Sequence, residues 1–316
     1  MLRGVRGDKN LCFKTFGMIE RNWKKYNENL VKRGEIWISK EILQKIKEKN
    51  EEENKRGRPY KYKSNFIKSI LILKNIFRLP YRQTEGFIRG IFGWLNIDIP
   101  NFRTICYRNK KMEIDYEMNV ELRDNAVIVI DSTGMKITNR GDWMRSKRRV
   151  SNRKGWIKVH VAYDIESKQV VDFEVTDESG QDCKEGLKII ERLGERYNRA
   201  NKKIKKVIGD AGYDTYEIFN YLSERGISAV IKLRSNAKLS NNLSRSRIIR
   251  YMRDSGRNWS KELGYNWRWL VESFFSAYKR TFGESVSGRS MDTIKKEIFF
   301  KLLIMNSFYS YNNLTI

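Results

Sequence analysis

Two acidic residues follow short runs that are expected to form strands, and they could act together. Asp131 comes directly after the apolar run 126–130, and Asp210 comes just after the short run 206–208. If these runs form neighbouring parallel strands, both carboxylates emerge at the same edge of one sheet. Asp also favours turns, so two plain turns after strands explain either residue taken alone. Paired carboxylates at one edge would suit metal-dependent phosphodiester chemistry.

A third carboxylate lies on a helix expected over residues 265–282. At about 100° per residue, one face of this helix groups four polar side chains within roughly 60°, namely Tyr265, Arg268, Glu272 and Lys279. The apolar residues fall on the other side and can pack against a sheet. An exposed i,i+4 pair of Arg268 and Glu272, worth only about 0.3–0.5 kcal/mol, is the alternative explanation. That alternative accounts for two of the four residues.

Taken together, these motifs resemble the DDE transposases of bacterial and archaeal insertion sequences. The resemblance rests on V-I-D-S ending in Ser132, on I-G-D-A-G-Y ending in Tyr213, and on the helix pattern Y-x2-R-x3-E-x6-K. Residues 57–59 and 82–87 also look like the family's N-terminal region, so the resemblance extends from about residue 56 to the C-terminus. It implies a catalytic domain with an RNase H-like mixed sheet flanked by helices.

The resemblance also implies a function, a metal-dependent cleavage of DNA followed by strand transfer. Asp131 would bridge two Mg²⁺ (or Mn²⁺) ions in each active site, while Asp210 and Glu272 would each complete one ion's ligands. Two divalent ions roughly 3.5–4 Å apart stabilise both the attacking and the leaving oxygens. Water cleaves the strand first, and the freed 3′ hydroxyl then attacks target DNA. This chemistry needs no covalent protein intermediate.

Basic and aromatic side chains near the acids suit DNA handling. Arg268 and Lys279 can pair with phosphates, and Arg268 can also orient Glu272. Tyr265 can stack on a base or donate to a phosphate. The basic stretches 135–158 and 238–261 suit a distorted duplex, with solvated charged loops as the alternative.

Composition narrows the function classes. The 316 residues carry a net charge of +26, which makes a polyanion the expected partner. The single histidine, His160, excludes a His-rich zinc site, and we expect a structural or DNA-facing role for it. Three widely spaced cysteines predict neither zinc nor disulfides, which favours a reducing cytoplasm. Since DNA is the expected partner, we expect the protein to lie at the nucleoid. The apolar runs are too short for a membrane span, and no signal peptide is expected.

Upstream of the acids, the periodicity predicts three short helices over residues 64–77, 81–94 and 101–111. Their order resembles a helix-turn-helix unit whose last, basic helix carries Arg103 and Arg108 as candidate DNA contacts. A helical packing domain with a solvated basic face is the alternative. The preceding basic stretch 56–63 is similar to a minor-groove AT-hook, or is a basic linker leading into the helix.

The elements that must position the acids alternate along the rest of the chain. Strands are expected over residues 126–130, 156–163, 170–175, 206–208 and 229–233, and helices over 184–197, 216–225, 265–282 and 294–309. This order predicts an α/β class with a mixed sheet flanked by helices. The expected domains are a charged region of unknown role (1–54), a helical DNA-binding domain (55–115) and the catalytic domain (118–316).

The expected partners are double-stranded DNA, both as terminal inverted repeats and as target, and further copies of this chain in a synaptic complex. Two other functions stay open. An RNase H-like nuclease that only hydrolyses would need the same acids, and a captured transposase could serve as a DNA-binding regulator. Short inverted repeats around the reading frame would favour a mobile element.

Overall fold

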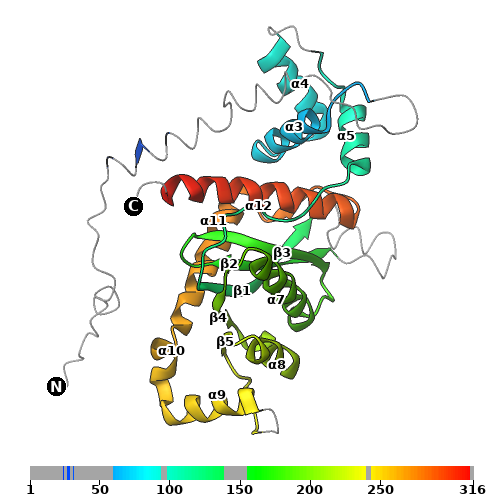
Figure 1. Ribbon diagram of the computed structural model, residues 1–316. Coiled ribbons are helices and arrows are strands. Elements are labelled where there is room, and N and C mark those ends of the chain that lie inside the picture. The colour runs from blue at the N-terminus through cyan, green and yellow to red at the C-terminus, as the bar shows by residue number, and fades with distance from the viewer. Residues whose placement is uncertain are drawn as a thin grey trace, which may run out of the picture.

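The computed structural model describes residues 60–93, 98–138, 155–239 and 243–313, together with four positions between 24 and 31. Three expectations lie outside these residues. They are the charged region 1–54, apart from those four positions, the start of the basic stretch at 56–59, and most of the basic stretch that follows Asp131. Figure 1 shows the described elements, with three helices above a sheet and the remaining helices around it.

A mixed sheet forms the centre of the catalytic part of the chain. Its strands are β1 (Ala126–Ile137), β2 (Trp156–Asp164), β3 (Gln169–Asp177), β4 (Ile204–Gly209), β5 (Ser228–Ile231) and β6 (Ser285–Val286). Five of them lie in the order β3-β2-β1-β4-β5, and β6 pairs with the end of β1. The β2 strand runs antiparallel to β1 and β3, whereas β4 is parallel to both of its neighbours. The expected mixed α/β sheet is confirmed.

Helices cover both faces of this sheet, because the central strands are apolar on both sides. One face packs against α7 (Asp182–Arg199), and the other against α11 (Trp269–Phe282) and α12 (Met291–Asn313). Ring contacts from Tyr163 on β2 to Phe274 on α11, and from Phe173 on β3 to Phe299 on α12, join the strands to these two helices. In the described parts of the chain, none of the helices is both long and apolar enough to cross a membrane.

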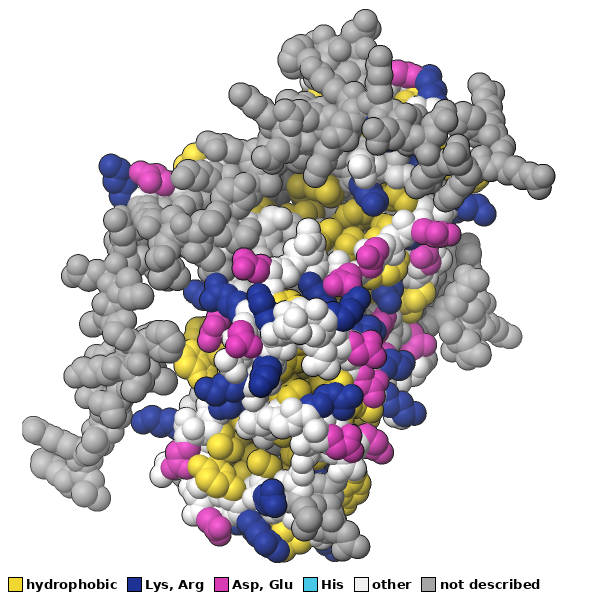
Figure 2. Space-filling model, in the orientation of Figure 1, with side chains coloured by type: hydrophobic (Ala, Val, Ile, Leu, Met, Phe, Trp, Pro, Cys, Tyr) yellow, Lys and Arg dark blue, Asp and Glu magenta, His cyan; other side chains and the backbone are white. Residues whose placement is uncertain are grey.

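Three elements of the catalytic part were not expected from the sequence. The basic stretch 238–261 contains α9 (Leu243–Asp254) and α10 (Trp259–Glu262), which follow α8 (Tyr216–Glu224) and β5. The short strand β6 was also missed. Figure 2 shows that Lys and Arg side chains on this face of the molecule are interspersed with Asp and Glu rather than gathered in one patch.

The upstream helices pack onto the catalytic part through α12. They are α3 (Ser64–Ile76), α4 (Tyr81–Phe92) and α5 (Phe102–Lys111), close to the predicted ranges. Lys296 on α12 donates to the backbone carbonyls of Asn109 and Lys110 at 3.0 and 3.2 Å, at the end of α5. Arg78, just after α3, donates to the carbonyls of Arg280 and Thr281. One continuous hydrophobic core therefore spans both parts.

A buried amide closes the edge of the sheet against α12. The Asn306 side chain accepts from the Val170 N–H and donates to the Val170 carbonyl, both at 2.8 Å, and is almost fully buried. Among the described strands, β3 has a neighbour on one side only, and these two bonds satisfy Val170 on the other side. Asn306 thus ties the start of β3 to the C-terminal helix.

We expect Asn306→Ala to lower the free energy of unfolding by about 3 kcal/mol, because it leaves two buried backbone groups of Val170 unpaired. Urea denaturation followed by circular dichroism measures this change. Asn198→Ala, at an exposed position on α7, is the matched control and should shift stability by about 0.5 kcal/mol or less. Equal, small effects of both variants would contradict the assigned role of Asn306.

Candidate active site

Asp131 lies where β1 loses one neighbour but keeps the other. The pairing of β1 with β4 ends at Val129 and Ile208, whereas its pairing with β2 continues to Lys136 and Trp156. The expectation that Asp131 ends its strand was therefore wrong, because β1 extends to Ile137. Asp131 nevertheless lies at the carboxyl end of the shared β1–β4 ladder.

Asp210 follows β4 directly and is held by a tight turn. Its Oδ1 accepts a hydrogen bond from the Gly212 N–H at 2.8 Å, at the start of the short 3₁₀ helix Ala211–Tyr213. A Cβ atom at Gly212 would lie 2.9 Å from Asp210 Oδ1, so a larger residue there would disturb this carboxylate. The parallel pairing of β1 and β4 is confirmed, and it places both acids at one edge of the sheet.

Glu272 reaches the same edge from α11, and Arg268 joins it to Asp131. The Arg268 guanidinium donates through Nη1 to Asp131 Oδ2 at 2.8 Å and through Nη2 to Glu272 Oε1. The helical range was predicted one turn too long, since Tyr265–Arg268 forms a 3₁₀ turn and α11 begins at Trp269. The i,i+4 spacing still brings Arg268 and Glu272 together.

The charge of Asp131 is costly at this position. The pKa of this carboxyl is raised from 3.8 to about 6, mainly by burial and in smaller part by the nearby carboxylates of Asp210 and Glu272. The Ser132 N–H, which donates to Asp131 Oδ1 at 2.9 Å, and the Arg268 guanidinium both act to lower this pKa. The three acids therefore share one electrostatic environment.

The three carboxylates can be compared with the ligands that a divalent cation needs. Three carboxylates supply the oxygen ligands that Mg²⁺ prefers, and their mutual repulsion around Asp131 favours a bound positive charge. Within the described residues, however, no three acidic, His or Cys side chains lie close enough together to hold one ion. The guanidinium of Arg268 already lies between Asp131 and Glu272. The donor set thus fits a metal in its chemistry, provided that Arg268 moves.

Of the other two residues on the predicted helix face, one joins the acids and one does not. Tyr265 is half-buried, and its hydroxyl has a raised pKa because of burial, with Asp210 and Asp131 contributing. It also interacts with Arg268. Lys279 lies two turns beyond Glu272 and is partly exposed, and among the described residues it forms no ion pair with these acids.

The two candidate residues on α5 differ in exposure. Arg103 is exposed on the first turn of α5. Arg108 is buried, and its guanidinium donates to the Tyr62 carbonyl at 2.7 Å and to Ser64 Oγ at 2.9 Å. The structure therefore corrects the expectation for Arg108, whose side chain faces the chain preceding α3 instead of a DNA-facing surface. Helical periodicity alone cannot reveal such a partner, because it lies 44 residues away.

Comparison with models of protein families identifies the family of this chain. Residues 123–307, more than half of the chain, match the family model described as a transposase DDE domain. The chain belongs to this family. A second model with the same description matches residues 31–140 of the transposase. The protein is thus a DNA transposase, and the acids described above lie inside the first match.

Solved structures show only a distant likeness to the transposase. The piggyBac transposase synaptic complex with hairpin DNA has 11% identity and a TM-score of 0.39, covering 90% of this chain and 75% of that chain. The Drosophila P element transposase strand transfer complex has 12% identity, a TM-score of 0.31 and coverages of 87% and 70%. The Mos1 strand transfer complex has 11% identity, a TM-score of 0.30 and coverages of 83% and 79%. Likeness at this level adds nothing to the family assignment.

The burial of Asp131 predicts a pH-dependent effect on stability. Because its folded-state pKa lies above the unfolded value, the folded protein binds the extra proton between pH 3.8 and 6, and stability is lost as pH rises through this window. Asp131→Asn removes this cost. In metal-free buffer we expect the variant to be more stable than the unchanged protein at pH 7.5, by up to roughly 3 kcal/mol, and the gain to shrink towards pH 4.5.

Paired urea titrations at the two pH values measure the difference. Glu224→Gln, an exposed acid at the end of α8, serves as the control, for which we expect no such dependence. A stability difference for Asp131→Asn that is the same at both pH values would contradict the assigned burial cost.

Proposed function

We propose that this transposase cleaves DNA at the ends of an insertion sequence and joins the 3′ hydroxyl ends to target DNA, with Asp131, Asp210 and Glu272 as its catalytic acids. The observation that carries this proposal is the meeting of three acids from three separate elements at one sheet edge. Arg268 connects two of them directly, and Asp210 interacts with Asp131 across the β1–β4 pair.

The same three residues are proposed to hold two Mg²⁺ or Mn²⁺ ions. When bound, such ions lower the pKa of an attacking water and stabilise charge on the leaving oxygen. Asp131 is proposed to be the acid that both ions share, because its carboxylate feels the charges of both Asp210 and Glu272. The Ser132 N–H keeps the Asp131 carboxylate oriented towards α11.

Arg268 is proposed to change partners when DNA binds. Its planar guanidinium satisfies two carboxylates in the absence of a metal ion, and the same fork can accept a phosphate in two-bond geometry. Its release from Asp131 frees that carboxylate. Lys279 is proposed to contact the DNA backbone further along the helix, and Tyr265 to contact a base or phosphate next to Arg268.

The upstream helices are proposed to bind the terminal inverted repeats. Their last helix, α5, exposes Arg103 in its first turn and carries further basic residues in its last turn. The proposed boundaries are 55–115 for this domain and 118–316 for the catalytic domain, with the role of 1–54 unassigned. On the strength of the Y-R-E-K pattern we propose that the protein belongs with the bacterial and archaeal insertion-sequence group. We further propose that it acts in the cytoplasm at the nucleoid, as a homo-oligomer on two DNA ends.

Two other functions use the same site. A nuclease that only hydrolyses would leave cut ends unjoined, and a captured regulator would bind DNA without cutting it. A strand-transfer assay on a labelled duplex carrying the inverted repeat next to the reading frame separates all three, because only the transposase joins that end to a second duplex.

We expect Asp131→Asn, Asp210→Asn and Glu272→Gln each to abolish cleavage of this duplex while leaving DNA affinity within about threefold. Each change removes a charged oxygen ligand but leaves the basic surface intact. Single-turnover cleavage and filter binding measure the two properties. Glu224→Gln is again the control, and a native cleavage rate in any of the three acid variants would remove that acid from the site.

Arg268→Lys keeps the charge but loses the planar fork. An ammonium cannot reproduce the two-bond contact with a phosphate that is proposed for the Arg268 guanidinium once DNA is bound. We expect cleavage to slow about tenfold or more, as for the loss of one charged hydrogen bond of about 1.5 kcal/mol. Arg253→Lys, at an exposed position on α9, is the matched control. Equal rates in both variants would favour a plain surface pair.

A further inference from the structure

A second polar cluster lies on the opposite face of β1 from Asp131. Because side chains alternate along a strand, Ser132 points to the α7 face while Asp131 points to α11. Ser132 Oγ donates to Asp182 Oδ1 at 2.9 Å, and Asp182 is the first residue of α7. Lys158 on β2 donates to both oxygens of the same carboxylate, at 3.3 and 3.1 Å.

The floor of this cluster is buried. His160 pairs with Ser132 across the β1–β2 ladder, is almost fully buried, and has Nε2 within 3.0 Å of Thr176 Oγ1. Its Nδ1 lies 3.4 Å from Asp182 Oδ1 but lacks hydrogen-bond geometry. Burial lowers the pKa of His160, which favours the neutral ring. Asp182 is therefore balanced mainly by Lys158 and by the Ser132 hydroxyl.

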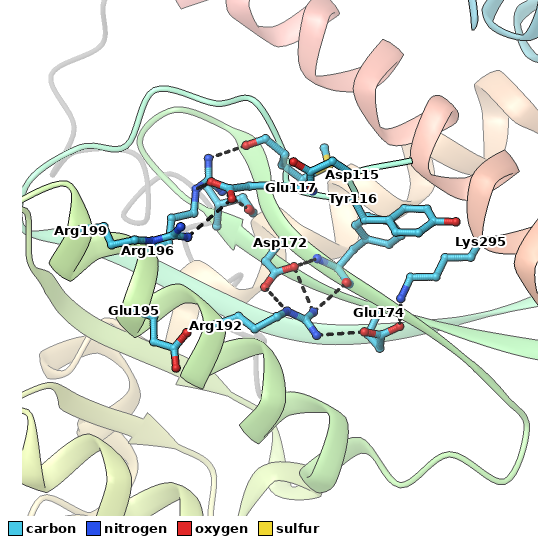
Figure 3. A pocket seen from close by; sticks show the side chains of 13 residues that line it. Asp115, Tyr116, Glu117, Asp172, Glu174, Arg192, Glu195, Arg196, Arg199 and Lys295 are labelled. Atoms are coloured by element: carbon cyan, nitrogen blue, oxygen red, sulfur yellow. Dashed lines mark hydrogen bonds and ion pairs between the residues drawn. The ribbon is translucent and has the colours of Figure 1, made fainter. Parts of the chain in front are cut away.

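The backbone on both sides of Asp182 is closely packed. Just before α7, Gly180 approaches Thr176 so closely that a Cβ atom would lie 2.1 Å from its Oγ1, and the Gly180 carbonyl accepts from Lys158. Further along α7, Arg192 binds Asp172 and Glu174 on β3. Figure 3 shows this second set of ion pairs, which lines a hollow of about 360 Å³. These contacts hold α7, and with it Asp182, in place against the sheet.

We propose that Asp182 is a positioning residue for the catalytic strand: through Ser132, it holds the Asp131 carboxylate in the orientation that binds metal. The inference rests on the proposed function of Asp131. The connection is short, since Asp182 binds the Ser132 side chain on one face while the Ser132 N–H binds Asp131 Oδ1 at the other. In this proposal neither Asp182 nor Ser132 is a ligand of the ion, and both act by holding the backbone at Ser132 in place.

Such supporting contacts have a measurable effect on metal sites. Loss of a residue that orients a metal ligand typically costs about 10–100-fold in metal affinity or activity. A structural role alone would lower stability without a selective loss of metal affinity. A role of Lys158 and Asp182 in binding DNA would lower DNA affinity and leave metal affinity unchanged. The three possibilities therefore differ in what they change.

The test uses the full chain and Mn²⁺ as the probe. Electron paramagnetic resonance measures Mn²⁺ binding without DNA, and the Mn²⁺ concentration for half-maximal single-turnover cleavage measures it with DNA. The variants are Asp182→Ala, Asp182→Asn, Ser132→Ala and Ser132→Thr, with Asp131→Asn as the reference for loss of a ligand. Glu185→Gln is the matched control, since Glu185 lies on the same helix and pairs with Lys188 instead.

We expect Asp182→Ala and Ser132→Ala each to weaken Mn²⁺ binding about tenfold or more, with DNA affinity unchanged. Ser132→Thr keeps the hydroxyl and should restore most of the affinity, and Asp182→Asn, which keeps an oxygen acceptor for Ser132, should lie between. If Asp182→Ala fails to fold, Ser132→Ala and Asp182→Asn carry the same comparison.

Two results separate the positioning role of Asp182 from the proposed metal binding by Asp131. If Asp131→Asn weakens Mn²⁺ binding but Asp182→Ala and Ser132→Ala do not, the positioning role is wrong and the acid site stands. If Asp131→Asn leaves Mn²⁺ binding unchanged, the assignment of Asp131 as a metal ligand fails first. Reduced DNA affinity with native Mn²⁺ affinity would also overturn the positioning role.

Discussion

The two-armed contact of Arg268 with Asp131 and Glu272 is the interaction on which the site depends. A carboxylate buried on a central strand is costly to ionise, and removing the Arg268 guanidinium would leave the charge of Asp131 poorly compensated. The contact also fixes how α11 lies on the sheet, because its two arms come from one planar group. Two of the acids proposed to hold a metal ion, Asp131 and Glu272, are therefore held together by a side chain that would have to move for an ion to bind.

The contacts of Asp131 limit the cost of keeping its buried carboxylate ionised. An uncharged residue at position 131 would favour stability in the absence of metal, so the ionised carboxylate is retained at a cost to folding. The cost is limited by two donors to Asp131, the backbone N–H of Ser132 and the guanidinium of Arg268, which lies just before α11. Stability and chemistry are thus opposed at one residue and reconciled by the side chains around it.

Much of the architecture follows from patterns in the chain. The β-branched run before Asp131 predicts a central strand, and the short run 206–208 before Asp210 predicts another. Parallel pairing of the two, once assumed, brings both acids to one edge of the sheet, and the structure has this pairing. The extension of β1 could not, because Ser132, Thr133 and Gly134 are polar or small and their pairing depends on β2.

Other features depend on partners distant in the sequence. Local periodicity predicts a helix through Tyr265, yet the chain forms a 3₁₀ turn there before α11. The burial of Arg108 depends on the backbone before α3, and the tie between Ser132 and Asp182 spans 50 residues. None of these contacts leaves a signal in the spacing of neighbouring residues.

The shared packing of α12 has a geometric consequence for any DNA held by the upstream helices. Because α12 contacts both β3 and α3, and Lys296 bonds to the end of α5, the helical part and the catalytic part are packed against one shared helix. If the upstream helices hold a duplex and the acids cut it, as proposed, this shared packing would set the distance between the two places. Each base pair inserted between them would turn the cutting point by about a tenth of a helical turn.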